Sequence, residues 1–91
     1  MYVGAIHTIS DPETFWSAAD PSAIPAGVTL LSTFPNKDGS RAVCLWEADS
    51  VETVQSLVDG MAGDAARNEC FEVDEQHPGT TGLPREAART A

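Results

Sequence analysis

Short apolar runs alternate with polar, proline-containing segments in the first part of the chain. Residues Tyr2–Ile9 are rich in β-branched and aromatic side chains and too few to form a stable helix alone, which predicts a strand. The sequence Ser10-Asp11-Pro12-Glu13 combines capping side chains with a proline and predicts a short helix over Pro12–Ala19. Two prolines in residues 20–27 cannot continue that helix, so we expect a connecting loop there.

A β-hairpin is predicted next. Val28–Phe34 and Arg41–Ala48 are both rich in β-forming residues, and the segment between them contains an Asp-Gly pair that suits a tight turn. The hairpin joins the second and third predicted strands.

An amphipathic helix and a last strand follow the hairpin. Asp49 and Ser50 can cap a helix whose apolar positions form one stripe, namely Val51, Val54, Leu57, Val58 and Met61. Polar residues, among them Gln55 and Asp59, lie opposite that stripe. Apolar and acidic residues then alternate over Asn68–Glu75, which predicts a half-buried strand.

The predicted order of elements is β-α-β-β-α-β, which is the split arrangement of ferredoxin-like domains. We therefore expect an α+β fold: a four-stranded antiparallel sheet with both helices on one face, because right-handed crossovers place them together. Residues 1–77 form this domain. Residues 78–91 show no apolar period and are expected to be a mobile C-terminal tail, with docking of Leu83 on a neighbouring subunit as the alternative.

The face of the sheet without helices needs a cover, because apolar side chains occur on both faces of the strands. A second copy of the sheet supplies one, and a chain of 91 residues gains stability from such association, since it buries only about 60% of its unfolded surface. Element order and size resemble the dimeric α/β-barrel superfamily over residues 2–77. This resemblance implies a homodimer.

Two segments carry a closer resemblance. The sequence Cys44-Leu45-Trp46-Glu47-Ala48, a capped helix, and then Asn68-Glu69-Cys70-Phe71-Glu72-Val73 are similar to small actinobacterial-type barrel proteins of the domain-of-unknown-function class. Some relatives of those proteins bind nickel. The resemblance implies sites within each sheet–helix layer or at the subunit interface.

The net charge of the chain limits the classes of partner that it can bind. Fourteen acidic and five basic residues give a net charge of -9, which repels phosphate backbones and anionic lipid, so neither nucleic acid nor a membrane is an expected partner. No apolar run approaches the roughly 20 residues of a membrane span, and the first residues lack the basic region of a secretory signal. We expect a cytoplasmic protein.

Histidine and aromatic residues are the candidates for a site. His7 lies on the first, central strand and can act as a base, a metal ligand or a hydrogen-bonded structural residue. Trp46 and Cys44 share one strand face and can line a pocket with His7, and Trp16 adds a large apolar surface; a dimer core is the alternative role.

The barrel resemblance adds two polar residues to this set. In cofactor-free barrel monooxygenases, polar side chains stabilise the anion of a substrate with an acidic C–H group. Asn68 and Glu72 would take that role here, beside His7 and Trp46.

We expect no metal and no cofactor. Cys44 and Cys70 are far apart in the sequence and lack a zinc-binding pattern, the end of the second helix offers no histidine for a nickel site, and no glycine-rich phosphate loop is present. The sequence thus predicts a homodimer that binds a small, largely apolar molecule, with monooxygenase-like or cyclase-like cofactor-independent chemistry as an extension. The alternatives are a structural or regulatory dimerisation module without a ligand, and a nickel-binding protein.

Overall fold

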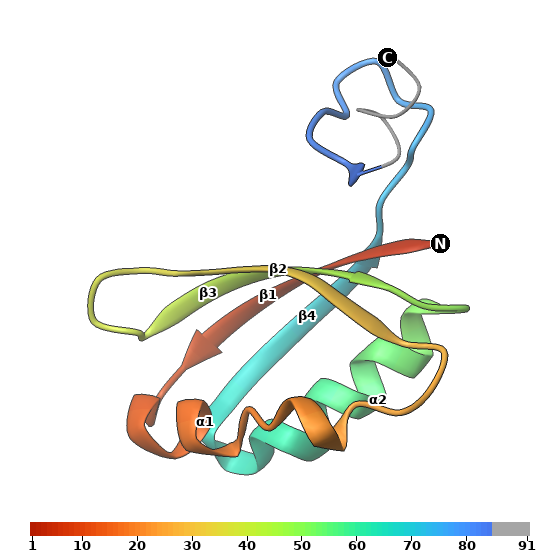
Figure 1. Cartoon of the computed structure of the whole chain (residues 1–91). Coiled ribbons are helices and arrows are strands. Elements are labelled where there is room, and N and C mark those ends of the chain that lie inside the picture. Colours follow the sequence, from red (N-terminus) through yellow and green to blue (C-terminus); the bar gives the residue numbers. More distant parts are fainter. Residues whose placement is uncertain (85–91) are drawn as a thin grey trace.

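A four-stranded antiparallel sheet carries two helices on one face (Figure 1). The computed structural model describes residues 1–84. The strands are β1 (Tyr2–Ile9), β2 (Thr29–Pro35), β3 (Arg41–Glu47) and β4 (Ala66–Glu72), and the helices are α1 (Pro12–Ala18) and α2 (Val51–Ala62), with single 3-10 turns at η1 (Pro21–Ala23) and η2 (Gly63–Ala65). The sheet order is β2-β3-β1-β4. The predicted α+β class, with four antiparallel strands and two helices, is confirmed, and the arrangement is compatible with a ferredoxin-like fold.

Side-chain caps fix where both helices begin. Asp11 caps α1, because its carboxylate accepts hydrogen bonds from the Thr14 amide at 3.2 Å and the Thr14 hydroxyl at 2.7 Å. Ser50 caps α2 by accepting from the Thr53 amide at 3.1 Å. The helix α1 ends at Ala18, one residue before the predicted end.

The predicted bounds of the fourth strand were wrong. The strand β4 starts two residues earlier, at Ala66, and ends at Glu72 rather than Glu75. It ends there because Asp74 starts a turn, in which its carboxylate accepts from the Gln76 amide at 2.9 Å. The last acidic residues therefore belong to a turn and do not alternate across a sheet. The predicted bounds of β1 are confirmed, both ends of β2 lie one residue later than predicted, and β3 starts as predicted and ends one residue earlier.

One face of β1 meets the helices, and its register partners on β3 and β4 share that face. Val3 pairs with Trp46, and Ala5 pairs with Cys44 on one side and Cys70 on the other. This face, with His7 and Ile9, is covered by the helices and contains the core, whose buried members are Val3, Ala5, Val28, Cys44, Trp46, Ala48, Val54 and Val58. The alternate residues of β1, which include Gly4, lie on the face without helices, called the open face below.

The chain after β4 rises on the side of the open face (Figure 1). Leu83 is buried in its own chain, at 5% exposure, and the Thr80 hydroxyl donates to the Asp74 carbonyl at 2.6 Å. Residues 85–91 of the predicted mobile tail lie outside the described residues. Among residues 1–84, no helix is long and apolar enough to cross a membrane.

Candidate functional site

A cleft of about 560 Å³ lies between the sheet and the segment that joins β1 to β2. Its floor is the helix-facing side of the sheet, where β1 contributes His7 and β3 contributes Cys44 and Trp46. Thr33 of β2 completes the floor, because it is the register partner of Cys44 and so points the same way. A volume of this size is in the range of small-molecule sites, which is roughly 300 to 1,000 Å³.

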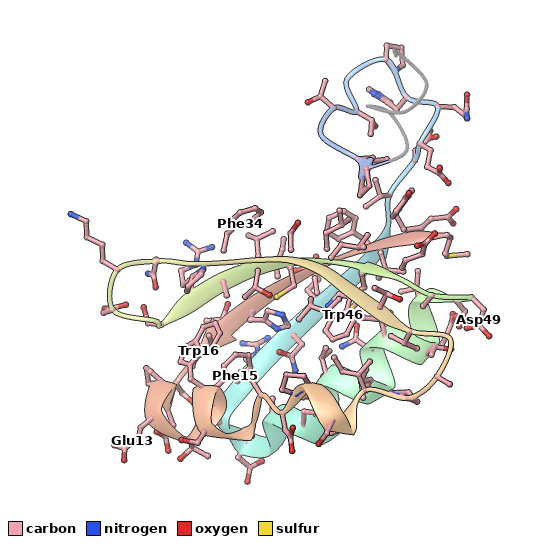
Figure 2. The ribbon with its side chains drawn as sticks, in the orientation of Figure 1. Glu13, Phe15, Trp16, Phe34, Trp46 and Asp49 are labelled. Atoms are coloured by element: carbon pink, nitrogen blue, oxygen red, sulfur yellow. The ribbon has the colours of Figure 1, made fainter. Side chains whose placement is uncertain are left out.

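Two aromatic side chains of α1 form one wall of the cleft. Figure 2 shows Phe15 and Trp16 between α1 and the sheet. The Trp16 indole N–H donates to the Gly39 carbonyl at 2.9 Å, which ties α1 to the β2–β3 hairpin and fixes the ring. The Phe15 ring packs edge-on against Trp16 and lies 5.4 Å, between ring centroids, from His7. This wall is therefore largely apolar, and a hydrogen bond holds Trp16 against the hairpin.

The remaining wall is also mostly apolar. It comes from the loop after α1, the start of β2 and the inner side of α2, with the lining residues Ala19, Asp20, Pro21, Ile24, Val28, Thr29, Leu30, Val58, Met61 and Ala62. The Asp20 carboxylate accepts from the Ser22 hydroxyl and amide at 2.8 and 2.9 Å, and these bonds lower the pKa of Asp20. The described lining contains no lysine or arginine, so the cleft offers no fixed positive charge to an anion.

His7 is the buried polar residue of the floor and belongs to a hydrogen-bonded network. Its ring is 2% exposed, and Nδ1 lies 2.6 Å from Asn68 Oδ1 on β4. Asn68 Nδ2 donates to the Asp59 carboxylate at 2.9 Å, and Gln55 Nε2 donates to both oxygens of Asp59 at 3.1 Å. Gln55 Oε1 accepts from the Cys70 backbone amide at 3.1 Å. The helix α2 is thus linked through β4 to a histidine in the cleft.

Two ring nitrogens at the floor lack a partner among the described residues. The Nε1 atom of Trp46 is fully buried and unpaired, which is costly for a donor. It is the one fully buried side-chain N or O atom in residues 1–84 without a partner. The Nε2 atom of His7 has no hydrogen-bond partner among the described residues either, and the His7 side chain lines the cleft.

The structure brings most of the predicted site residues together. His7, Trp16, Cys44 and Trp46 line the cleft, and Asn68 lies directly behind His7. Glu72 does not join them: it lies on the exposed part of β4 and borders a shallow depression formed with residues 73–76.

Three residues of this region were not identified from the sequence. Phe15 was counted only as an aromatic side chain that adds to the apolar surface of Trp16 and Trp46, and Gln55 and Asp59 were placed opposite the apolar stripe of the second helix. The i, i+4 spacing of Gln55 and Asp59 allows them to pair, as they do here, but gives no sign that they meet β4.

The cysteines of the region are both free. Cys44 and Cys70 flank Ala5 across two strand spacings, about 9 to 10 Å, which is too far for a disulfide. Burial raises the pKa of the Cys44 thiol, and the hydrogen bond to Thr33 opposes this shift. No group of three or more His, Cys, Asp or Glu side chains in residues 1–84 is placed to hold a metal ion.

Comparison with known proteins gives no relative for this arrangement: no protein-family model matches the chain, and no curated protein is significantly similar to it.

Proposed function

We propose that the protein binds a small, largely apolar molecule in the cleft between the sheet and the β1–β2 segment. The observation that carries this proposal is a cleft of about 560 Å³ with mostly apolar walls, lined at its floor by a histidine whose Nε2 has no partner among the described residues. Apolar walls with few convergent polar groups are typical of small-molecule sites. The same nitrogen is the group that cofactor-independent chemistry at an acidic C–H would use as a base.

Native mass spectrometry of the untagged protein tests whether a small molecule is retained from the cell. A second test titrates the protein with 2-naphthol, an apolar probe with one hydroxyl group, and follows the amide resonances of the cleft. We expect Ala19→Trp to abolish naphthol binding, because Ala19 lines the cleft and is exposed, so that the added indole fills the space. Ala26→Trp is the matched control, since Ala26 is an exposed loop residue outside the lining. No binding of naphthol by the unmodified chain would contradict the proposal.

We also propose that the open face is the interface of a homodimer. Large apolar side chains are exposed there: Phe34 at 67%, Val43 at 52% and Phe71 at 47%. Val43 is the register partner of both Phe34 and Ile6, so these three side chains form one row across the sheet. Figure 2 shows Phe34 on the side of the sheet opposite the helices. A second open face of the same composition would remove this row from water.

Sedimentation equilibrium tests the dimer. We expect Val43→Glu to convert the dimer to a monomer, because a carboxylate would face the apolar row of the partner. Ser56→Glu adds the same charge at an exposed position of α2 and should leave the dimer intact. A dimer that binds no small molecule would favour a structural or regulatory dimerisation module instead.

A further inference from the structure

The Asp59 carboxylate fixes the direction of every hydrogen bond between α2 and His7. A carboxylate can only accept, so the Asn68 amide must turn its NH₂ group to Asp59, at 2.9 Å. The Asn68 oxygen then faces His7 Nδ1 at 2.6 Å and can only accept from it. The orientation of the neighbouring Gln55 amide is also fixed, because a backbone N–H can only donate and that of Cys70 donates to the Gln55 oxygen. His7 Nδ1 is therefore the protonated nitrogen.

A neutral imidazole with a proton on Nδ1 has a lone pair on Nε2. Nε2 has no partner among the described residues, and His7 lines the cleft, whose described lining carries no lysine or arginine. At His7 the floor therefore presents an acceptor to a ligand, and the described lining offers no lysine or arginine that would hold a carboxylate beside it.

We propose that Asp59 and Asn68 are positioning residues that hold His7 in the Nδ1–H tautomer, and that the ligand is an apolar molecule with a hydroxyl or N–H group that donates to His7 Nε2. This inference rests on the proposed function and names the chemical class of the ligand. The hydrogen-bonded series Asp59–Asn68–His7 thus favours a ligand that carries an O–H or N–H donor over the same molecule without that donor hydrogen.

Nitrogen NMR of the histidine rings tests the tautomer without any ligand. At alkaline pH, where imidazoles are neutral, we expect long-range proton–nitrogen spectra of ¹⁵N-histidine-labelled protein to show His7 protonated at Nδ1 and bare at Nε2. His77 is the sole other histidine and is assigned by its loss in His77→Gln. A proton on Nε2 of His7 would overturn the proposal.

Variants separate positioning from packing. Asn68→Leu removes the acceptor of Nδ1 at nearly constant volume and should release His7 into a mixture of tautomers, whereas Asp59→Asn keeps an acceptor oxygen and should preserve the Nδ1–H form. A His7 tautomer that is unchanged in folded Asn68→Leu would overturn the positioning role.

The ligand class is tested with 2-naphthol against 2-methoxynaphthalene, which lacks the hydroxyl hydrogen. We expect naphthol to bind about five-fold more tightly, the size of one net neutral hydrogen bond, and the ratio to approach one in His7→Phe. Equal binding of the two probes would overturn the inference and leave the proposed cleft function standing. Absence of binding of either probe would overturn the cleft function itself, and with it the ligand class.

Discussion

The outer edge of the Phe71 ring lies directly over Gly4 on the open face. The two residues are register partners on β4 and β1, and a Cβ atom added to Gly4 would lie 2.5 Å from Phe71 Cζ. Glycine leaves a gap in the pleated surface of a strand, and an aromatic ring from the next strand fills it here. The exposed half of the ring then belongs to the apolar surface proposed for dimerisation.

A double-mutant cycle measures this contact. We expect Gly4→Ala to lower the free energy of unfolding by about 1 kcal/mol in the presence of Phe71, because the ring must move aside. In a Phe71→Ala background the same change should be neutral or stabilising, since the obstacle is gone and alanine is the better strand residue. Equal effects in both backgrounds, measured by urea denaturation, would refute the contact.

The N-terminal cap of α2 makes a measurable contribution to stability. The Ser50 hydroxyl accepts from the Thr53 amide at 3.1 Å, and α2 supplies the core residues Val54 and Val58. Ser50→Ala should lower the free energy of unfolding by about 1 kcal/mol. Ser56→Ala, at an exposed position inside the same helix, should cost nothing because alanine is the better helix former. Similar losses for both variants would show that the cap is not the cause.

The thiol of Cys70 should react slowly with alkylating reagents. Its pKa is raised to about 11, first by burial, then by the negative charge of Asp59, and least by Cys44. In a Cys44→Ser background, we expect the rate with iodoacetamide to rise steadily between about pH 8 and pH 10 without levelling off. Asp59→Asn removes the charge but not the burial, so its profile should shift to lower pH without reaching the ordinary value. A plateau below pH 10 in the Cys44→Ser protein would contradict the raised pKa.

The same shift makes the protein less stable in alkali. The thiol deprotonates in the unfolded chain near the ordinary value of 9.0 and in the folded chain only near pH 11. Stability from this group is therefore complete below about pH 9 and is lost as the pH rises through that interval.

The sequence predicted correctly those site residues that come together because of their spacing within one strand. Cys44 and Trp46 are two residues apart, so they share a face of any strand, and both line the cleft. Glu72 shares the face of Asn68 for the same reason. It lies four residues farther along β4, however, about 13 Å away, opposite Val3 rather than His7. The sequence shows which residues of a strand share a face, but it does not show which residue of the neighbouring strand lies opposite each of them.

The network behind His7 depends on contacts that no local pattern encodes. Asp59 was placed on the solvent side of its helix because helical periodicity separates only apolar from polar positions. Its contact with Asn68 results from the packing of α2 against the edge strand β4, together with the register that sets Asn68 opposite His7. Both are tertiary outcomes, which is why the histidine was identified as a candidate and its positioning residues were not.

The carboxyl group of Asp20, at the edge of the cleft, should titrate below its ordinary value. The Ser22 hydroxyl and the Ser22 backbone amide both donate to this carboxylate. Both bonds lower the pKa of Asp20 from 3.8, and the hydroxyl has the larger effect. Because the folded pKa is the lower one, the contribution to stability is present above about pH 3.8 and is lost as the pH falls through the folded pKa.

Ser22→Ala provides the test, because it removes the hydroxyl and keeps the amide. We expect the pKa of Asp20, followed by carbon NMR of the carboxyl group, to rise toward 3.8 without reaching it. Asp38 is the internal control: its pKa is lowered by Ser40 in the same way, and Ser22→Ala should not change it. An unchanged Asp20 titration in Ser22→Ala would mean that the hydroxyl does not hold this carboxylate, and that the loop at the edge of the cleft is fixed by its backbone alone.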